Sequence, residues 1–173
     1  MREWRKTRME HGWQKRFSKV MEVAMQQGDF HAPANIIVDH ALKLGFSRAH
    51  LFWVPSQQDV NPDNLFIGIA CAGDGIIPGF EGSLFPLADW FDLRKASREN
   101  NAITLRCLRT DKAIEAAEMY DFRPPSLDAT ILPIRRGKKL AGYLLLDFDQ
   151  ERRTLSNHEH SLLNLFARQV TVI

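Results

Sequence analysis

The stretch "LPIRRGKKLAGYLLLDF", residues 132–148, decides the fold of this 173-residue chain. Two apolar runs flank the basic turn Arg136-Gly137-Lys138, in which glycine supplies the positive φ that a tight hairpin requires. In the second run, apolar residues occupy both alternating sets of positions, so both faces of that strand are apolar. A strand of this kind lies centrally in a sheet that is covered on both sides.

Further strands and helices precede the hairpin. The predicted strands are "RAHLFWV" (48–54), which is also apolar on both faces, "LFIGIACA" (65–72), "SLFPL" (83–87), "AITLRCL" (102–108) and the first hairpin strand (129–135). The predicted helices are residues 33–44, "ADWFDLRKASREN" (88–100) and "DKAIEAAEMY" (111–120), and the glycine-rich residues 73–83 form a loop. Strands joined by hairpins pair antiparallel, so we predict an α+β fold whose first and last helices share one face of the sheet.

The two ends of the chain are predicted to be helical. Residues 1–28 form a basic amphipathic helix, whose charges we interpret as a solvated face because no other stretch continues a basic track. We therefore expect no nucleic-acid partner, at a net charge of only +2. Ser156 and Glu159 have the spacing of a capping box, which starts the last helix near Asn157. The predicted core stripe of that helix is Leu162, Leu163, Phe166, Val170 and Ile173.

Residues 129–173 resemble the C-terminal half of a GAF domain. The matching features are the Leu132-Pro133-Ile134 step, the basic hairpin, the "GYLLLDF" strand (142–148), the Arg152-Arg153 turn, the capped helix start and the run from Leu162 to Gln169. Residues 34–54 are similar to the first helix and strand of that family, so the resemblance covers about residues 29–173. It implies a six-stranded antiparallel sheet, with terminal helices on one face and short helices and loops over a small-molecule pocket on the other.

The resemblance also implies a function. GAF domains act as sensory or dimerising input modules ahead of histidine kinases, cyclic-dinucleotide enzymes or transcription activators. Leu165, Arg168 and Val172 lie at heptad-like spacing away from the core stripe, on a helix without a C-cap, and form a candidate dimer seam. We expect a non-catalytic cytoplasmic homodimer, cut from a longer bacterial chain that carries an output domain, with no resident cofactor and no membrane span.

The expected ligand is an unidentified small molecule. The candidate pocket residues are Trp90, Phe91, Arg106, Tyr120, Phe122, Asp128 and Thr130. Arg106 is a single charged residue in an otherwise apolar strand. If its side chain faces inward, it needs an anionic partner, and if it faces outward, it is an ordinary exposed residue of an edge strand. Trp90 and Phe91 can alternatively be interpreted as core residues.

The cysteines and histidines bear on several other chemistries. Cys71 and Cys107 are the only cysteines, which leaves open a redox enzyme resembling the methionine-sulfoxide-reducing members of the family. Neither is followed by histidine, as chromophore attachment in bilin-binding members would favour. His158 and His160 are two apart on a helix and cannot share a metal ion, so we expect no metal site. A third alternative is a domain used only for dimerisation, with its pocket filled by Trp and Phe side chains.

Overall fold

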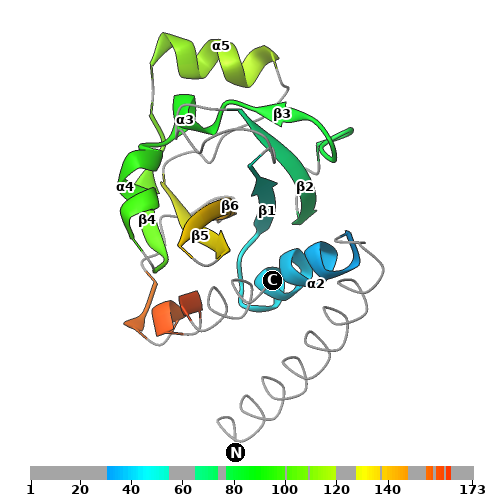
Figure 1. Cartoon of the computed structure of the whole chain (residues 1–173), viewed down its shortest axis with the longest axis vertical. Helices are drawn as coiled ribbons and strands as arrows, with labels where there is room; N and C mark the ends of the chain where they lie inside the picture. The colour runs from blue at the N-terminus through cyan, green and yellow to red at the C-terminus, as the bar shows by residue number, and fades with distance from the viewer. Residues whose placement is uncertain are drawn as a thin grey trace, which may run out of the picture.

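The computed structural model describes residues 31–54, 65–73, 77–99, 101–108, 110–119, 128–136, 138–147 and, except for 158 and 162, 155–164. The elements are α2 (His31–Lys43), β1 (Arg48–Trp53), β2 (Phe66–Gly73), β3 (Leu84–Phe85), α3 (Leu87–Trp90), α4 (Leu93–Arg98), β4 (Ile103–Arg106), α5 (Asp111–Met119), β5 (Asp128–Arg136) and β6 (Lys139–Asp147) (Figure 1). The predicted helix over residues 1–28 lies outside the described residues. Within the described part of the chain, no helix is long and apolar enough to cross a membrane.

The strands form a single six-stranded sheet in the order β3-β2-β1-β6-β5-β4. Every neighbouring pair is antiparallel. The two strands predicted to be central, β1 and β6, pair with each other in the middle of the sheet. The predicted α+β class and antiparallel six-stranded sheet are confirmed.

Gly142, in the middle of β6, allows the two central strands to approach. A Cβ atom at this position would lie 2.1 Å from the carbonyl oxygen of Phe52 in β1. No other residue type fits there unless the β1 backbone moves. The glycine of the "GYLLLDF" motif is therefore explained by the close packing of one strand on the next.

Each face of the sheet carries its own hydrophobic cluster. The helix face, as we call it, combines α2 with alternate strand residues; its buried members are Ala34, Ile37, Val38, Ala41, Phe46, Ala49, Leu51, Ala70, Leu132, Ile134, Leu144, Leu146, Leu155 and Leu163. Because Leu163 belongs to the predicted last helix, that segment and α2 cover the same face. The opposite face, which we call the aromatic face, carries α3, α4, α5 and the loop before β3.

The predicted capping box is present at residues 156–159. The Ser156 N–H donates to Glu159 Oε2 at 2.8 Å, and the Glu159 N–H donates to Ser156 Oγ at 3.3 Å. The reciprocal pair satisfies two N–H groups that a helix start would otherwise leave without acceptors. The other predicted stripe residues of this helix, and the candidate dimer seam Leu165, Arg168 and Val172, lie outside the described residues.

Residues 88–100, predicted to form one helix, form parts of two. Phe91 is extended, with φ −140° and ψ 148°, and interrupts the chain between α3 and α4. Asp92 then restarts the helix by accepting a hydrogen bond from the Lys95 N–H at 3.4 Å. Trp90 and Phe91, on either side of the point where α3 ends, are both buried, at 0% and 1% exposure.

Candidate functional site

The aromatic face is packed by large side chains of the chain itself. Its buried aromatic members are Phe52, Phe66, Phe80, Phe85, Trp90, Phe91 and Tyr143. The Phe80 ring lies 4.9 Å from that of Phe85 and 5.2 Å from that of Phe52, measured between centroids. These distances are those of favourable offset or edge-on aromatic pairs. The residues that cover this face are held to the sheet through these rings.

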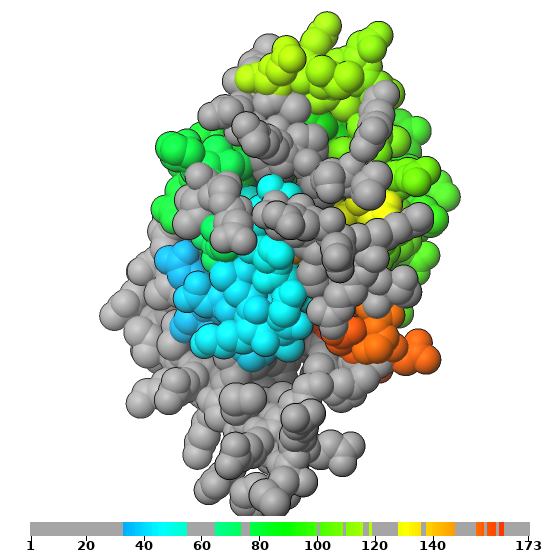
Figure 2. Space-filling view, turned by 180° about the vertical axis from the view of Figure 1, so that it is seen from behind, coloured from blue at the N-terminus to red at the C-terminus, as the bar shows by residue number. Residues whose placement is uncertain are grey.

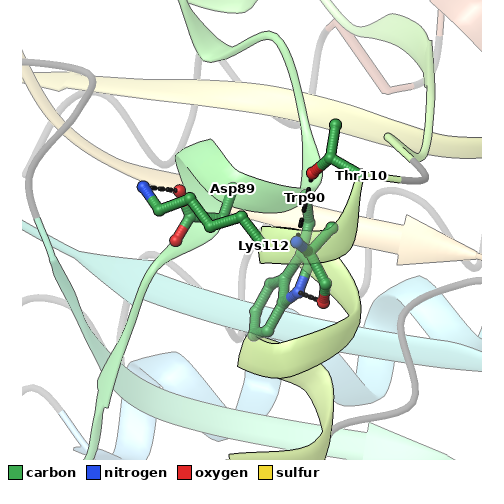
Figure 3. Close-up of polar contacts among 5 residues, drawn as sticks. Asp89, Trp90, Thr110 and Lys112 are labelled. Atoms are coloured by element: carbon green, nitrogen blue, oxygen red, sulfur yellow. Dashed lines mark hydrogen bonds and ion pairs between the residues drawn. The ribbon is translucent and has the colours of Figure 1, made fainter.

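Trp90 joins α3 to α5. Its indole Nε1–H donates to the carbonyl oxygen of Ala113 at 3.1 Å (Figure 3), and its own carbonyl accepts the Leu108 N–H at 2.7 Å. Ala113 is 3% exposed, whereas Ile114 beside it is 53% exposed. Trp90 thus supplies both the apolar surface and the donor that fix α5 over the aromatic face.

Two further contacts position the first turn of α5. The Thr110 hydroxyl oxygen accepts the Ala113 N–H at 3.1 Å, which caps the helix start. Lys112 Nζ lies 2.5 Å from Asp89 Oδ1 across the gap between α5 and α3 (Figure 3). The Lys112 side chain is 76% exposed, so water screens this ion pair.

The end of α4 is tied to the β5–β6 hairpin by Arg135. Its guanidinium donates to the carbonyl oxygens of Ser97 and Glu99, where a helix end lacks partners. At the start of α4, the Tyr143 hydroxyl donates to the Leu93 carbonyl oxygen at 3.5 Å. Burial raises the pKa of Tyr143, so the phenol stays a neutral donor.

A short loop, residues 77–83, lies on β2 before β3 begins. Gly68 donates its N–H to the Ser83 carbonyl at 2.9 Å and accepts the Gly82 N–H at 2.8 Å. A Cβ atom at Gly68 would lie 2.4 Å from the Phe80 carbonyl oxygen, so this approach requires glycine. The contact brings the Phe80 ring into the centre of the aromatic face.

His50 is the buried histidine of the aromatic face. It is 3% exposed in β1, with its ring centroid 5.4 Å from that of Phe80. Burial, with a smaller effect from the Arg48 charge, lowers the pKa of His50 from 6.5 to about 4. Arg48 itself pairs with the buried Asp147, Nε to Oδ1 at 2.8 Å. His50 is therefore neutral at physiological pH.

Neither Cys71 nor Cys107 is in a disulfide. Cys107 is buried in the aromatic-face cluster, one residue beyond the end of β4, although the sequence placed it within that strand. Cys71 is half-buried in β2, and burial raises its thiol pKa. A raised pKa lowers the thiolate fraction at neutral pH, which disfavours a nucleophilic or redox-active role.

The structure does not bring the described candidate pocket residues to one site. Trp90 and Phe91 lie together on the aromatic face. Asp128 and Thr130 alternate with Ala129 and Ile131 of that face, so they lie on the helix face instead. Arg106 is paired with Asp128 at the sheet edge, Nε to Oδ1 4.0 Å, with a side chain 72% exposed. Tyr120 and Phe122 lie outside the described residues.

Several residues of the site were not singled out from the sequence. Phe52 and Tyr143 could have been found, because strand alternation places both opposite the aliphatic positions. Phe80 and Arg135 could not, since their roles depend on a loop and a helix end brought to the sheet by tertiary contacts. Across the described ranges, no group of three or more His, Cys, Asp or Glu side chains is arranged to hold a metal ion.

Comparison with known proteins identifies the fold. The sequence matches no family model and no curated protein. Among solved structures, it is similar to residues 122 to 287 of a methyl-accepting chemotaxis protein, at TM-score 0.66 and 16% identity, covering 92% of both chains. The phycocyanobilin-bound GAF domain from a cyanobacterial phytochrome gives TM-score 0.60 and 16% identity, again over 92% of each chain.

A third structure is the second GAF domain of DevS from Mycobacterium smegmatis. It gives TM-score 0.55 and 21% identity, covering 80% of this chain and 87% of that one. The chain has the GAF fold. The resemblance inferred from the hairpin and the capped helix is confirmed at the level of the fold. In GAF terms, the aromatic face is the side on which the short helices and loops lie.

Proposed function

We propose that this chain is a sensory or regulatory input domain that binds a small molecule at the aromatic face. As a homodimer in the cytoplasm, it would control an output domain attached beyond its C-terminal helix. The observation that carries the proposal is the unequal cover of the two sheet faces. One face is closed by the long helix α2, and the other by short segments held through aromatic rings and a few polar contacts. Segments held in this way can open locally.

We propose that Trp90 and Phe91, at the break between α3 and α4, contact the ligand. Tyr120 and Phe122, in the segment after α5, are proposed as further ligand contacts. Aromatic side chains offer large apolar contact area, as small-molecule sites usually do. A phycocyanobilin-bound GAF domain among the similar structures supports ligand binding in this fold, without indicating which ligand this chain takes.

The mechanism would be a population shift. A ligand that prefers one arrangement of α3, α4 and α5 stabilises that arrangement by its difference in affinity between the two states. The sheet and the C-terminal helix would then adopt the geometry that the output domain reads. A chemotaxis protein among the similar structures fits such a role.

The second candidate is a domain that only dimerises. Trp90, Phe91 and Phe80 are almost fully buried, and their rings already fill much of the aromatic face. In that case the short helices would be a fixed cover, and the helix with Leu165, Arg168 and Val172 would carry the function. The redox alternative has less support, because burial raises the pKa of the Cys71 thiol.

Native mass spectrometry tests these alternatives. The purified protein is incubated with a small-molecule extract of its host, and the spectrum is compared with that after denaturation. A mass lost on denaturation, reduced in Trp90→Phe and kept in the exposed control Ile114→Ala, would support the sensory proposal. A bare dimer would favour the dimerisation-only function, and a bare monomer would contradict both.

A further inference from the structure

The edge strand β4 is connected at its two ends to opposite layers of the molecule. Before its start, Ala102 packs with the helix-face cluster, and its N–H donates to Asn164 Oδ1 at 2.9 Å. Beyond its end, the Leu108 N–H donates to the Trp90 carbonyl at 2.7 Å. Extended chain between these donors spans roughly 20 Å. In both overall views, the segment 155–164 lies beside the green elements at this edge (Figures 1 and 2).

Asn164 is an unusual residue for its place in the sequence. It follows Leu162 and Leu163 within the predicted last helix, where asparagine is a poorer helix former than leucine or alanine. Its side chain competes for backbone groups and normally favours caps and turns. Here its oxygen accepts a backbone N–H 62 residues away, at a partly buried site. The hydrogen bond explains why a polar residue interrupts an apolar run.

The strand between the two connections is firmly held. β4 pairs with β5 from Ile103↔Ile131 to Arg106↔Asp128. The side chains of Ile103 and Leu105 pack in the aromatic-face cluster. A paired strand is stiff along its length, so displacement of one end is carried to the other more readily than through a loop.

We propose that β4 is a coupling strand between the aromatic face and the C-terminal helix. Movement of Trp90 reaches β4 through the Leu108 hydrogen bond and leaves it through the Ala102–Asn164 hydrogen bond. Asn164 is then a positioning residue, which acts on the aromatic face only through β4. The biological use of this connection rests on the proposed sensory function, but the connection itself can be tested without a ligand.

The test compares two substitutions of similar size by NMR of the full ¹⁵N-labelled chain. Asn164→Asp keeps an acceptor oxygen for the Ala102 N–H, whereas Asn164→Leu removes it. In Asn164→Leu, we expect the Trp90 indole resonance to shift and hydrogen exchange of the Leu108 N–H to accelerate about tenfold, the factor for one ordinary hydrogen bond. Asn164→Asp should stay near the parent spectrum.

Ser161→Ala is the matched control on the same helix. Ser161 is exposed and its hydroxyl donates to the Asn157 carbonyl at 2.9 Å, so Ser161→Ala changes the same helix without touching β4. A Trp90 shift as large in Ser161→Ala as in Asn164→Leu would overturn the proposal. So would shifts in Asn164→Leu that stop at Ala102.

The reverse measurement keeps the proposal falsifiable if Asn164→Leu does not fold. Coupling between two sites is reciprocal, so Trp90→Phe should shift the Asn164 side-chain amide resonances. An unchanged chemical shift of the Asn164 amide in Trp90→Phe would overturn the proposal that β4 couples the two sites. If mass spectrometry detects no bound ligand, the sensory proposal fails, but the expected chemical-shift changes remain. If a ligand is detected and the Asn164 amide shift does not change in Trp90→Phe, only the coupling proposal fails.

Discussion

The two faces of the sheet are covered by different means. On the helix face, the 13-residue helix α2 buries Ala34, Ile37, Val38 and Ala41 against aliphatic strand residues. On the aromatic face, α3 has four residues, α4 has six and α5 has nine. Helices this short are not stable alone. They depend on buried rings and on individual hydrogen bonds, such as those of Trp90 and Arg135.

The difference has a consequence for local stability. A long amphipathic helix is held by many small contacts and tends to unfold with the core beneath it, whereas a short segment can detach when a few contacts break. The helix face should therefore behave as one cooperative unit. The aromatic face should respond piece by piece, which is what a regulated ligand site requires.

The largest expected effect is that of Trp90→Ala. It leaves a cavity and removes the donor to Ala113, so we expect the free energy of unfolding to fall by about 3–5 kcal/mol. Urea denaturation followed by circular dichroism measures the loss. Hydrogen exchange should accelerate most in α5, while the matched variant Ile37→Ala should accelerate it most in α2. Equal acceleration of both helices in both variants would contradict the contrast between the faces.

Features set by residues close together in the chain could be predicted from the sequence, whereas features set by tertiary contacts could not. The hairpin, the central strands and the capping box depend on residues near one another in the chain, such as Ser156 and Glu159, and their local patterns identified them. The break at Phe91 was missed, because residues 88–100 were interpreted as one helix and the burial of Trp90 and Phe91 depends on tertiary contacts.

The candidate site was harder to predict for the same reason. Trp90 and Phe91 were chosen for their residue type, and the structure brings them together. Asp128 and Thr130 were chosen for their place before the hairpin, but the strand register turns them to the helix face. The sheet face on which a polar strand residue lies can be assigned only once the face of a neighbouring residue is known. Here that neighbour is Ile131, which belongs to the aromatic face.

The aromatic face should also be the acid-sensitive face. Because the pKa of His50 is lowered from 6.5 to about 4, the unfolded state takes up a proton first as the pH falls. The free energy of unfolding should decrease between pH 6.5 and 4, by at most about 3 kcal/mol from this residue. Urea midpoints measured across that range should show a weaker dependence in His50→Gln.

His40 on α2 provides the control for the other face. Partial burial, with a smaller effect from Lys43, also lowers its pKa to about 4. Water screens a half-buried group more, so His40→Gln should flatten the pH dependence less than His50→Gln does. The reverse order would contradict the assignment of acid sensitivity to the aromatic face.

Two glycines distinguish strand-on-strand packing from loop-on-strand packing. An added Cβ would meet the Phe52 carbonyl of β1 in Gly142→Ala, and the Phe80 carbonyl of the loop in Gly68→Ala. The loop can shift and a central strand cannot, so we expect Gly68→Ala to lower the free energy of unfolding by about 1–3 kcal/mol and Gly142→Ala by more. Denaturant unfolding of both variants measures the order. A larger loss in Gly68→Ala would show that the loop is as rigid as the sheet.

The smallest expected effect separates the two kinds of contact that hold α5. Lys112→Ala removes an ion pair to Asp89 whose lysine is 76% exposed, and it leaves the Trp90 indole bonded to Ala113. We expect the free energy of unfolding to fall by less than about 1 kcal/mol, and by less still in high salt. Thermal denaturation at two ionic strengths measures this difference. A salt-insensitive loss comparable with that of Trp90→Ala would mean that charge, rather than the buried indole, fixes α5 over the aromatic face.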